Sequence, residues 1–79
     1  MIEPEMLATQ PPFVQRMGKE LNELQTRIKA LVEFTTTSKI FDNLPVLDQG
    51  LLQAQLSSMQ AYARILLIRL EKDLTQWKH

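Results

Sequence analysis

The chain has 79 residues, with nine basic and nine acidic side chains that give a formal net charge of zero, and it contains no cysteine. This length allows one domain at most, near the size at which a single core is marginal, and no disulfide can reinforce it. A neutral chain has no overall field that would attract a nucleic acid polymer or an anionic membrane, so neither is an expected partner.

The beginning of the chain does not have the pattern of a secretory signal. Residues 1–7 contain two acids and a proline, whereas a signal peptide needs basic residues followed by an apolar run. The longest uninterrupted apolar run, residues 65–68, is far shorter than a membrane-spanning segment. We therefore expect a soluble protein of the cytoplasm.

Residues 1–11 are expected to form an N-terminal arm that precedes the first helix. Two prolines interrupt any helix here, because proline lacks a backbone N–H donor. The apolar side chains of Ile2, Met6 and Leu7 would allow this arm to dock on a neighbouring surface, and a frayed terminus is the alternative.

A heptad pattern predicts the first helix over about residues 12–36. Pro12 suits the first helical turn, where its missing N–H leaves no intrahelical bond unmade. Seven side chains then recur at alternating steps of three and four, the spacing of a coiled-coil seam: Val14, Met17, Leu21, Leu24, Ile28, Leu31 and Thr35. The β-branched threonines that follow end this helix.

A second seam predicts a longer helix over about residues 46–76, after a connection at residues 37–45. Pro45 marks its start, and Asp48 in the first turn complements the helix dipole. The seam positions again recur at steps of three and four: Leu52, Leu56, Met59, Ala63, Leu66, Leu70, Leu74 and Trp77.

These elements predict an all-α fold, an antiparallel two-helix hairpin within a domain of residues 12–79. A short connection makes consecutive helices antiparallel, and aligning the two seams places Met17 opposite Leu66. Residues 65–68 are apolar almost all the way round the second helix, so one partner helix cannot cover them. We therefore expect hairpins to associate into a homo-oligomeric helical bundle through Ala61, Ile65, Leu67 and Ile68.

The sequence offers no set of residues suited to catalysis. It has no cysteine, no glycine-rich loop and no Ser/His/Asp arrangement, and its one histidine is the last residue, His79. A single histidine cannot build a metal site, so no metal and no cofactor is expected. We expect a protein that is not an enzyme.

Basic residues provide the candidate ligand site. Under the antiparallel register, four basic residues fall in the same half of the hairpin, with an aromatic ring and an amide further along: Arg16, Lys19, Arg64, Arg69, Tyr62 and Gln55. Guanidinium groups grip phosphate through paired hydrogen bonds, so this set suits a small anionic nucleotide. The alternative is that Arg16 and Arg69 lie over the oligomer seam and pair with Glu20 or Glu71.

Five short motifs lie between Phe13 and about Leu74. In chain order they are Phe13-Val14-x-Arg16-Met17-x-x-Glu20-Leu21, Leu24-x-x-Arg27-Ile28-x-x-Leu31 with Phe34, Phe41-x-x-Leu44, Leu51-Leu52-x-x-Gln55-Leu56-x-x-Met59-x-x-Tyr62 and Leu66-x-x-Arg69-Leu70. In these motifs the chain resembles a family of small helical-hairpin proteins common in tailed-phage genomes and related to a hypothetical protein of crAss-like phages. The start of the second helix departs from that family, because Pro45, Val46 and Gly50 stand where a serine cap and acidic residues are expected.

The resemblance implies a phage or prophage accessory protein, acting in the cytoplasm of an infected or lysogenic bacterial host, without a settled activity. Small phage hairpins of this kind are similar in design to anti-defence sponges, oligomers that sequester nucleotide immune signals. This implies capture of a cyclic oligonucleotide or an ADP-ribose-type signal without conversion. A protein–protein interaction module that inhibits a host or phage protein is the alternative, because an all-helical oligomer serves either role.

Overall fold

In the computed structural model, residues 9–76 are described, and within that range they form three helices and no strand. The helices are α2 (Pro12–Thr37), the four-residue α3 (Lys39–Asp42) and α4 (Val46–Gln76). The all-helical class predicted from the sequence is thereby confirmed. The expected connection contains an additional short helix, α3, and α2 ends one residue later than expected.

Some of the sequence-based expectations lie outside the described residues. These are the docking of the arm through Ile2, Met6 and Leu7, and the place of Trp77 at the end of the second seam.

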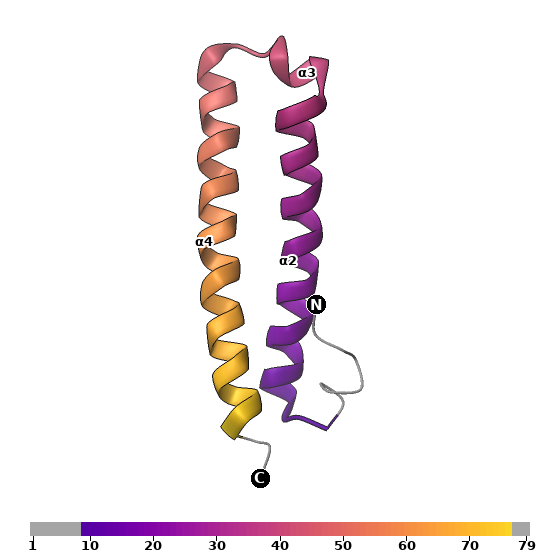
Figure 1. The fold of residues 1–79 in the computed structure, drawn as a ribbon, viewed down its shortest axis with the longest axis vertical. Helices are drawn as coiled ribbons and strands as arrows, with labels where there is room; N and C mark the ends of the chain where they lie inside the picture. The colour runs from indigo at the N-terminus through magenta and orange to yellow at the C-terminus, as the bar shows by residue number, and fades with distance from the viewer. Residues whose placement is uncertain (1–8, 77–79) are drawn as a thin grey trace.

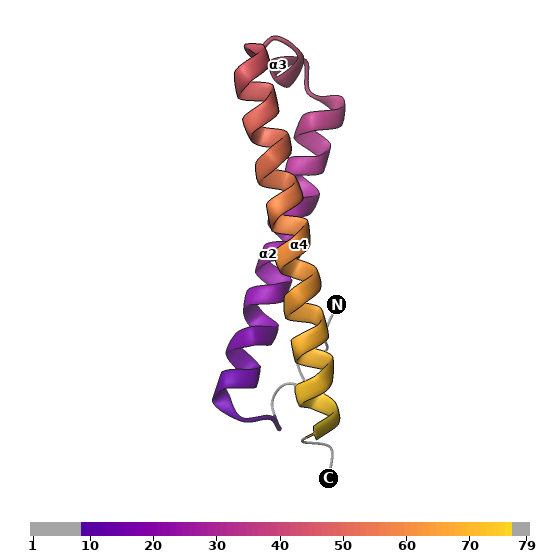
Figure 2. The ribbon, with the colours of Figure 1, turned by 90° about the vertical axis from the view of Figure 1, so that its left-hand side faces the viewer.

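The two long helices, α2 and α4, lie side by side and run in opposite directions, with α3 at the end where the chain turns (Figure 1). A view turned by 90° shows them crossing at a shallow angle near the middle of their length (Figure 2). The molecule measures 52 × 18 × 15 Å, so it is a rod one helix pair thick. Among the described residues, no helix is both long and apolar enough to cross a membrane.

The hydrophobic core follows the two seams where α2 meets α4. Its buried members come from both helices: Val14, Met17, Leu21, Leu24, Leu66 and Leu70. Five partly buried side chains pack against them: Ile28, Met59, Ala63, Leu67 and Leu74. Full burial of one such aliphatic side chain contributes about 1.5–3 kcal/mol, so this seam is the main source of stability. Leu67, expected at an oligomer interface, lies partly buried against this core.

Side-chain hydrogen bonds fix the connection at the α3 end. The Ser38 hydroxyl accepts a hydrogen bond from the Ile40 N–H at 3.1 Å and so caps α3. The Gln49 side-chain amide, in the first turn of α4, donates to the carbonyl oxygens of Phe41 and Leu44 at 3.0 and 3.1 Å. The first turn of α4 therefore holds the backbone of the turn that precedes it.

Gly50 lies inside α4 with room for a larger side chain. Its φ is not positive, and a β-carbon added there would meet no atom within 4 Å. Because alanine is favoured over glycine in a helix interior, Gly50→Ala should raise the free energy of unfolding by about 0.5–1 kcal/mol. Chemical denaturation followed by circular dichroism measures this change. Gln53→Ala is the matched control, and its free energy of unfolding should change little. A loss of stability in Gly50→Ala would show that there is no room for a β-carbon at position 50.

Candidate functional site

Residues from both long helices meet along one edge of the helix pair. Gln55, Tyr62 and Arg69 recur every seven residues of α4, so they lie on one face of that helix. Tyr62 contacts Glu20 of α2, which identifies the edge that this face borders. Arg16 lies four residues before Glu20 on the same side of α2. We call this surface the Tyr62 edge.

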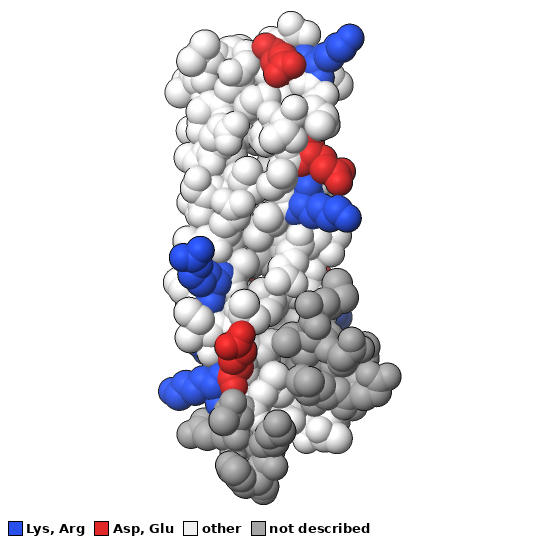
Figure 3. Space-filling view, in the orientation of Figure 1, with Lys and Arg blue, Asp and Glu red and all other residues white. Residues whose placement is uncertain are grey.

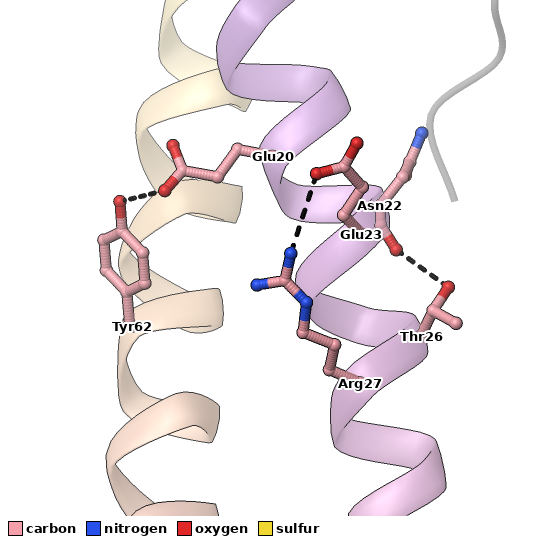
Figure 4. Close-up of polar contacts among 6 residues, drawn as sticks. All are labelled: Glu20, Asn22, Glu23, Thr26, Arg27 and Tyr62. Atoms are coloured by element: carbon pink, nitrogen blue, oxygen red, sulfur yellow. Dashed lines mark hydrogen bonds and ion pairs between the residues drawn. The ribbon is translucent and has the colours of Figure 1, made fainter.

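A hydrogen bond between the two helices lies at the centre of the Tyr62 edge. The Tyr62 hydroxyl donates to a carboxylate oxygen of Glu20 at 2.7 Å (Figure 4). This bond, with some desolvation and the negative charge of Glu20, raises the pKa of Tyr62, and the positive charge of Arg69 opposes the rise. Arg69 lies two helical turns after Tyr62 on the same face of α4, and its positive charge is the source of this opposing effect.

A hollow of about 370 Å³ opens on the same edge, between the second half of α2 and the first half of α4. Its lining combines apolar and aromatic walls with one guanidinium and one amide: Arg27, Ala30, Leu31, Phe34, Gln55 and Met59. Small-molecule sites commonly have this composition, with a few polar groups set among apolar walls. Chemically, such a hollow can bind a flat ring system and fix its orientation through the amide.

Arg27 contributes the positive charge at the rim of this hollow. Its guanidinium lies 3.9 Å from a carboxylate oxygen of Glu23, and both side chains are exposed (Figure 4). An exposed pair between residues four apart on a helix contributes only about 0.3–0.5 kcal/mol. Arg27 can therefore turn toward an anionic ligand at small cost.

The structure does not bring all six candidate ligand residues together. Arg16, Tyr62, Arg69 and Gln55 belong to the Tyr62 edge. Arg64 instead lines a separate hollow of about 310 Å³ on α4, with Ser57, Gln60 and Ala61. Lys19 is exposed on α2, three residues after Arg16. Within residues 9–76 no group of three or more His, Cys, Asp or Glu side chains could hold a metal ion.

The hollow was not predicted from the sequence, although Gln55 was a predicted ligand residue. Arg27 was not among the predicted ligand residues, and Leu31 and Met59 were predicted as seam residues. The signal that could have found the hollow is the antiparallel register. That register sets the part of α2 around Arg27 beside the part of α4 that carries Gln55 and Met59.

Glu20→Gln tests the hydrogen bond at the centre of the edge. The carboxylate stabilises the neutral phenol, so the pKa of Tyr62 should fall toward the ordinary tyrosine value in this variant. The stabilising contribution is present below the ordinary tyrosine pKa and is lost as the pH rises through the raised pKa of the folded protein. Spectrophotometric titration measures this directly, because the chain has one tyrosine. Glu23→Gln is the control, and an unchanged Tyr62 pKa in Glu20→Gln would contradict the bond.

The chain matches a known protein family. Residues 11–72 match the family model described as Sequestin, and this range contains the whole Tyr62 edge and the residues that line the hollow. No curated protein and no solved structure matches the chain.

Proposed function

The chain belongs to the Sequestin family, and we propose on this basis that it sequesters a small nucleotide immune signal without converting it. The signal is a cyclic oligonucleotide or an ADP-ribose-type nucleotide, and the protein acts as a phage or prophage accessory factor in the cytoplasm of the bacterial host. The family name itself refers to sequestration, which favours a binding protein over a catalyst.

The composition of the hollow is the observation that carries this proposal. Its volume of about 370 Å³ lies within the range of about 300–1,000 Å³ typical of small-molecule sites. Leu31, Phe34 and Met59 offer apolar walls for the flat face of a nucleobase. The Gln55 amide both donates and accepts hydrogen bonds, as recognition of a base edge requires.

The charges along the Tyr62 edge suit the remaining parts of a nucleotide. Arg27, at the rim of the hollow, would bind a phosphate next to the base. Arg16 lies eleven residues before Arg27, or about 16 Å along α2, where it and Arg69 would bind a second phosphate of an elongated ligand. The Glu20 carboxylate between them repels phosphate but accepts hydrogen bonds from ribose hydroxyls.

A homo-oligomer completes the proposed site. One two-helix hairpin leaves the hollow on its surface, so a neighbouring copy is needed to bury a dinucleotide-sized ligand. The exposed Ile65 and Ile68 of α4 support such assembly into a helical bundle, because large apolar side chains gain free energy when they leave water.

The direct test is isothermal titration calorimetry of the purified protein against a cyclic dinucleotide, cyclic ADP-ribose and linear ADP-ribose, with ATP as the comparison metabolite. We expect saturable binding of at least one signalling nucleotide. Heat denaturation followed by mass spectrometry should release the same nucleotide unchanged. Absence of binding across the panel, or recovery of a converted product, would overturn the proposal.

Removal of a guanidinium from the Tyr62 edge should weaken capture. Loss of one charge-assisted hydrogen bond to phosphate costs about 2–3 kcal/mol, so Arg69→Ala and Arg27→Ala should each lower affinity about thirtyfold or more. Arg64→Ala is the matched control on α4, because Arg64 lines the separate hollow. Helicity and oligomeric state should not change in any of the three. Full affinity in both edge variants would show that the ligand binds elsewhere.

A further inference from the structure

The outward side of α4 carries a second stripe with coiled-coil spacing, separate from the seam that packs on α2. Its members recur at alternating steps of four and three: Leu47, Leu51, Ala54, Ser58, Ala61, Ile65 and Ile68. All seven are exposed, and the four large ones keep between 53% and 72% of their surface accessible. We call this surface the outer stripe.

The order of side-chain sizes along the outer stripe reads the same in both directions. Two large residues stand at each end, Leu47 and Leu51 at one and Ile65 and Ile68 at the other, and the three residues between them are small. A two-fold interface requires this kind of self-complementarity, because the same patch must fit itself after rotation.

We propose that the outer stripe binds the outer stripe of a second copy of this chain, antiparallel, with the two-fold axis passing near Ser58. Leu47 and Leu51 of one copy then lie along Ile68 and Ile65 of the other, and the small middle residues of the two copies face each other. This interface rests on the homo-oligomer of the proposed function and specifies its surface and orientation, and its formation requires no nucleotide.

The middle of the outer stripe is suited to close contact between two helices. Ala54, Ser58 and Ala61 have short side chains, so the two α4 backbones can approach closely there. The Ser58 hydroxyl already donates to the Ala54 carbonyl oxygen at 3.0 Å within its own helix. Burying Ser58 therefore leaves no hydroxyl hydrogen without an acceptor.

The length of the outer stripe and its lack of charge also suit contact with the α4 helix of a second copy. The outer stripe spans three heptads, which is the extent at which apolar heptads indicate a coiled coil. From Gln49 to Ala63 α4 has no charged residue, and the part of α4 next to α3 shows an uncharged surface (Figure 3). The central part of a protein interface is similarly depleted in charge.

The charges at the two ends of the uncharged stretch favour the antiparallel orientation. Asp48 precedes it, and Arg64 follows it. In an antiparallel pair the Asp48 end of one copy lies beside the Arg64 end of the other, whereas a parallel pair would place like charges together.

Single cysteines test this arrangement, because the chain has none of its own. Under mild oxidation Ser58→Cys should form a covalent dimer in high yield, since residues on the two-fold axis meet their own copies. Leu51→Cys alone should not, because its two copies lie about 21 Å apart, fourteen residues along antiparallel helices. An equimolar mixture of Leu51→Cys and Ile65→Cys should form the mixed dimer. Gln53→Cys, exposed but outside the outer stripe, is the control for random collision.

Three results would overturn the proposal. Efficient self-linking of Leu51→Cys would show a parallel pair, and equal, low yields for Ser58→Cys and Gln53→Cys would show that the outer stripe does not bind a second copy. Light scattering provides a second readout without oxidation, in which Ile65→Glu should reduce the mass and retain helical circular dichroism. A wild-type monomer at micromolar concentration would also contradict it. None of these measurements uses a nucleotide, so failure of this interface is distinguished from failure of nucleotide capture, which the calorimetric titration tests.

Discussion

The packing of one apolar seam against another is the interaction on which the rest of this structure depends. Leu21, Leu66, Leu70 and Val14 are almost fully buried where α2 meets α4, and no further layer of helices lies within the described residues. Because the core is one side chain thick, each long helix buries one face and leaves the others to solvent. The register of this seam also decides which residues of α2 and α4 become neighbours at each edge.

Three surfaces of α4 therefore differ in character. The inner seam supplies stability, the Tyr62 edge presents a hollow and charged groups suited to a nucleotide, and the outer stripe presents a self-complementary apolar face. The Tyr62–Glu20 hydrogen bond links the two helices in the middle of the edge, between the hollow and Arg69. A neutral overall charge is compatible with such a site, because the guanidinium groups act locally and not through a long-range field.

Periodicity was sufficient to predict the helical class and most buried residues, because burial in a helix follows steps of three and four. Leu67 shows the limit: four consecutive apolar residues do not reveal which of them faces the core, since this depends on the rotation of α4. The hollow was not predicted, because it depends on where the side chains of Leu31, Phe34 and Met59 leave space. The role of Gln49 depends on the path of the connection, which its sequence does not specify.

In the proposed function, a nucleotide binds in the hollow on the Tyr62 edge. Nuclear magnetic resonance on isotope-labelled protein tests this most directly. A cyclic dinucleotide or cyclic ADP-ribose is added to the protein, and the resonances of the Met59 methyl group and the Gln55 side-chain amide are observed. Saturable shifts at both groups, with little change at the Leu47 and Leu51 methyl groups of the outer stripe, are the predicted result. Shifts confined to the outer stripe, or no shift with any signalling nucleotide, would contradict the account.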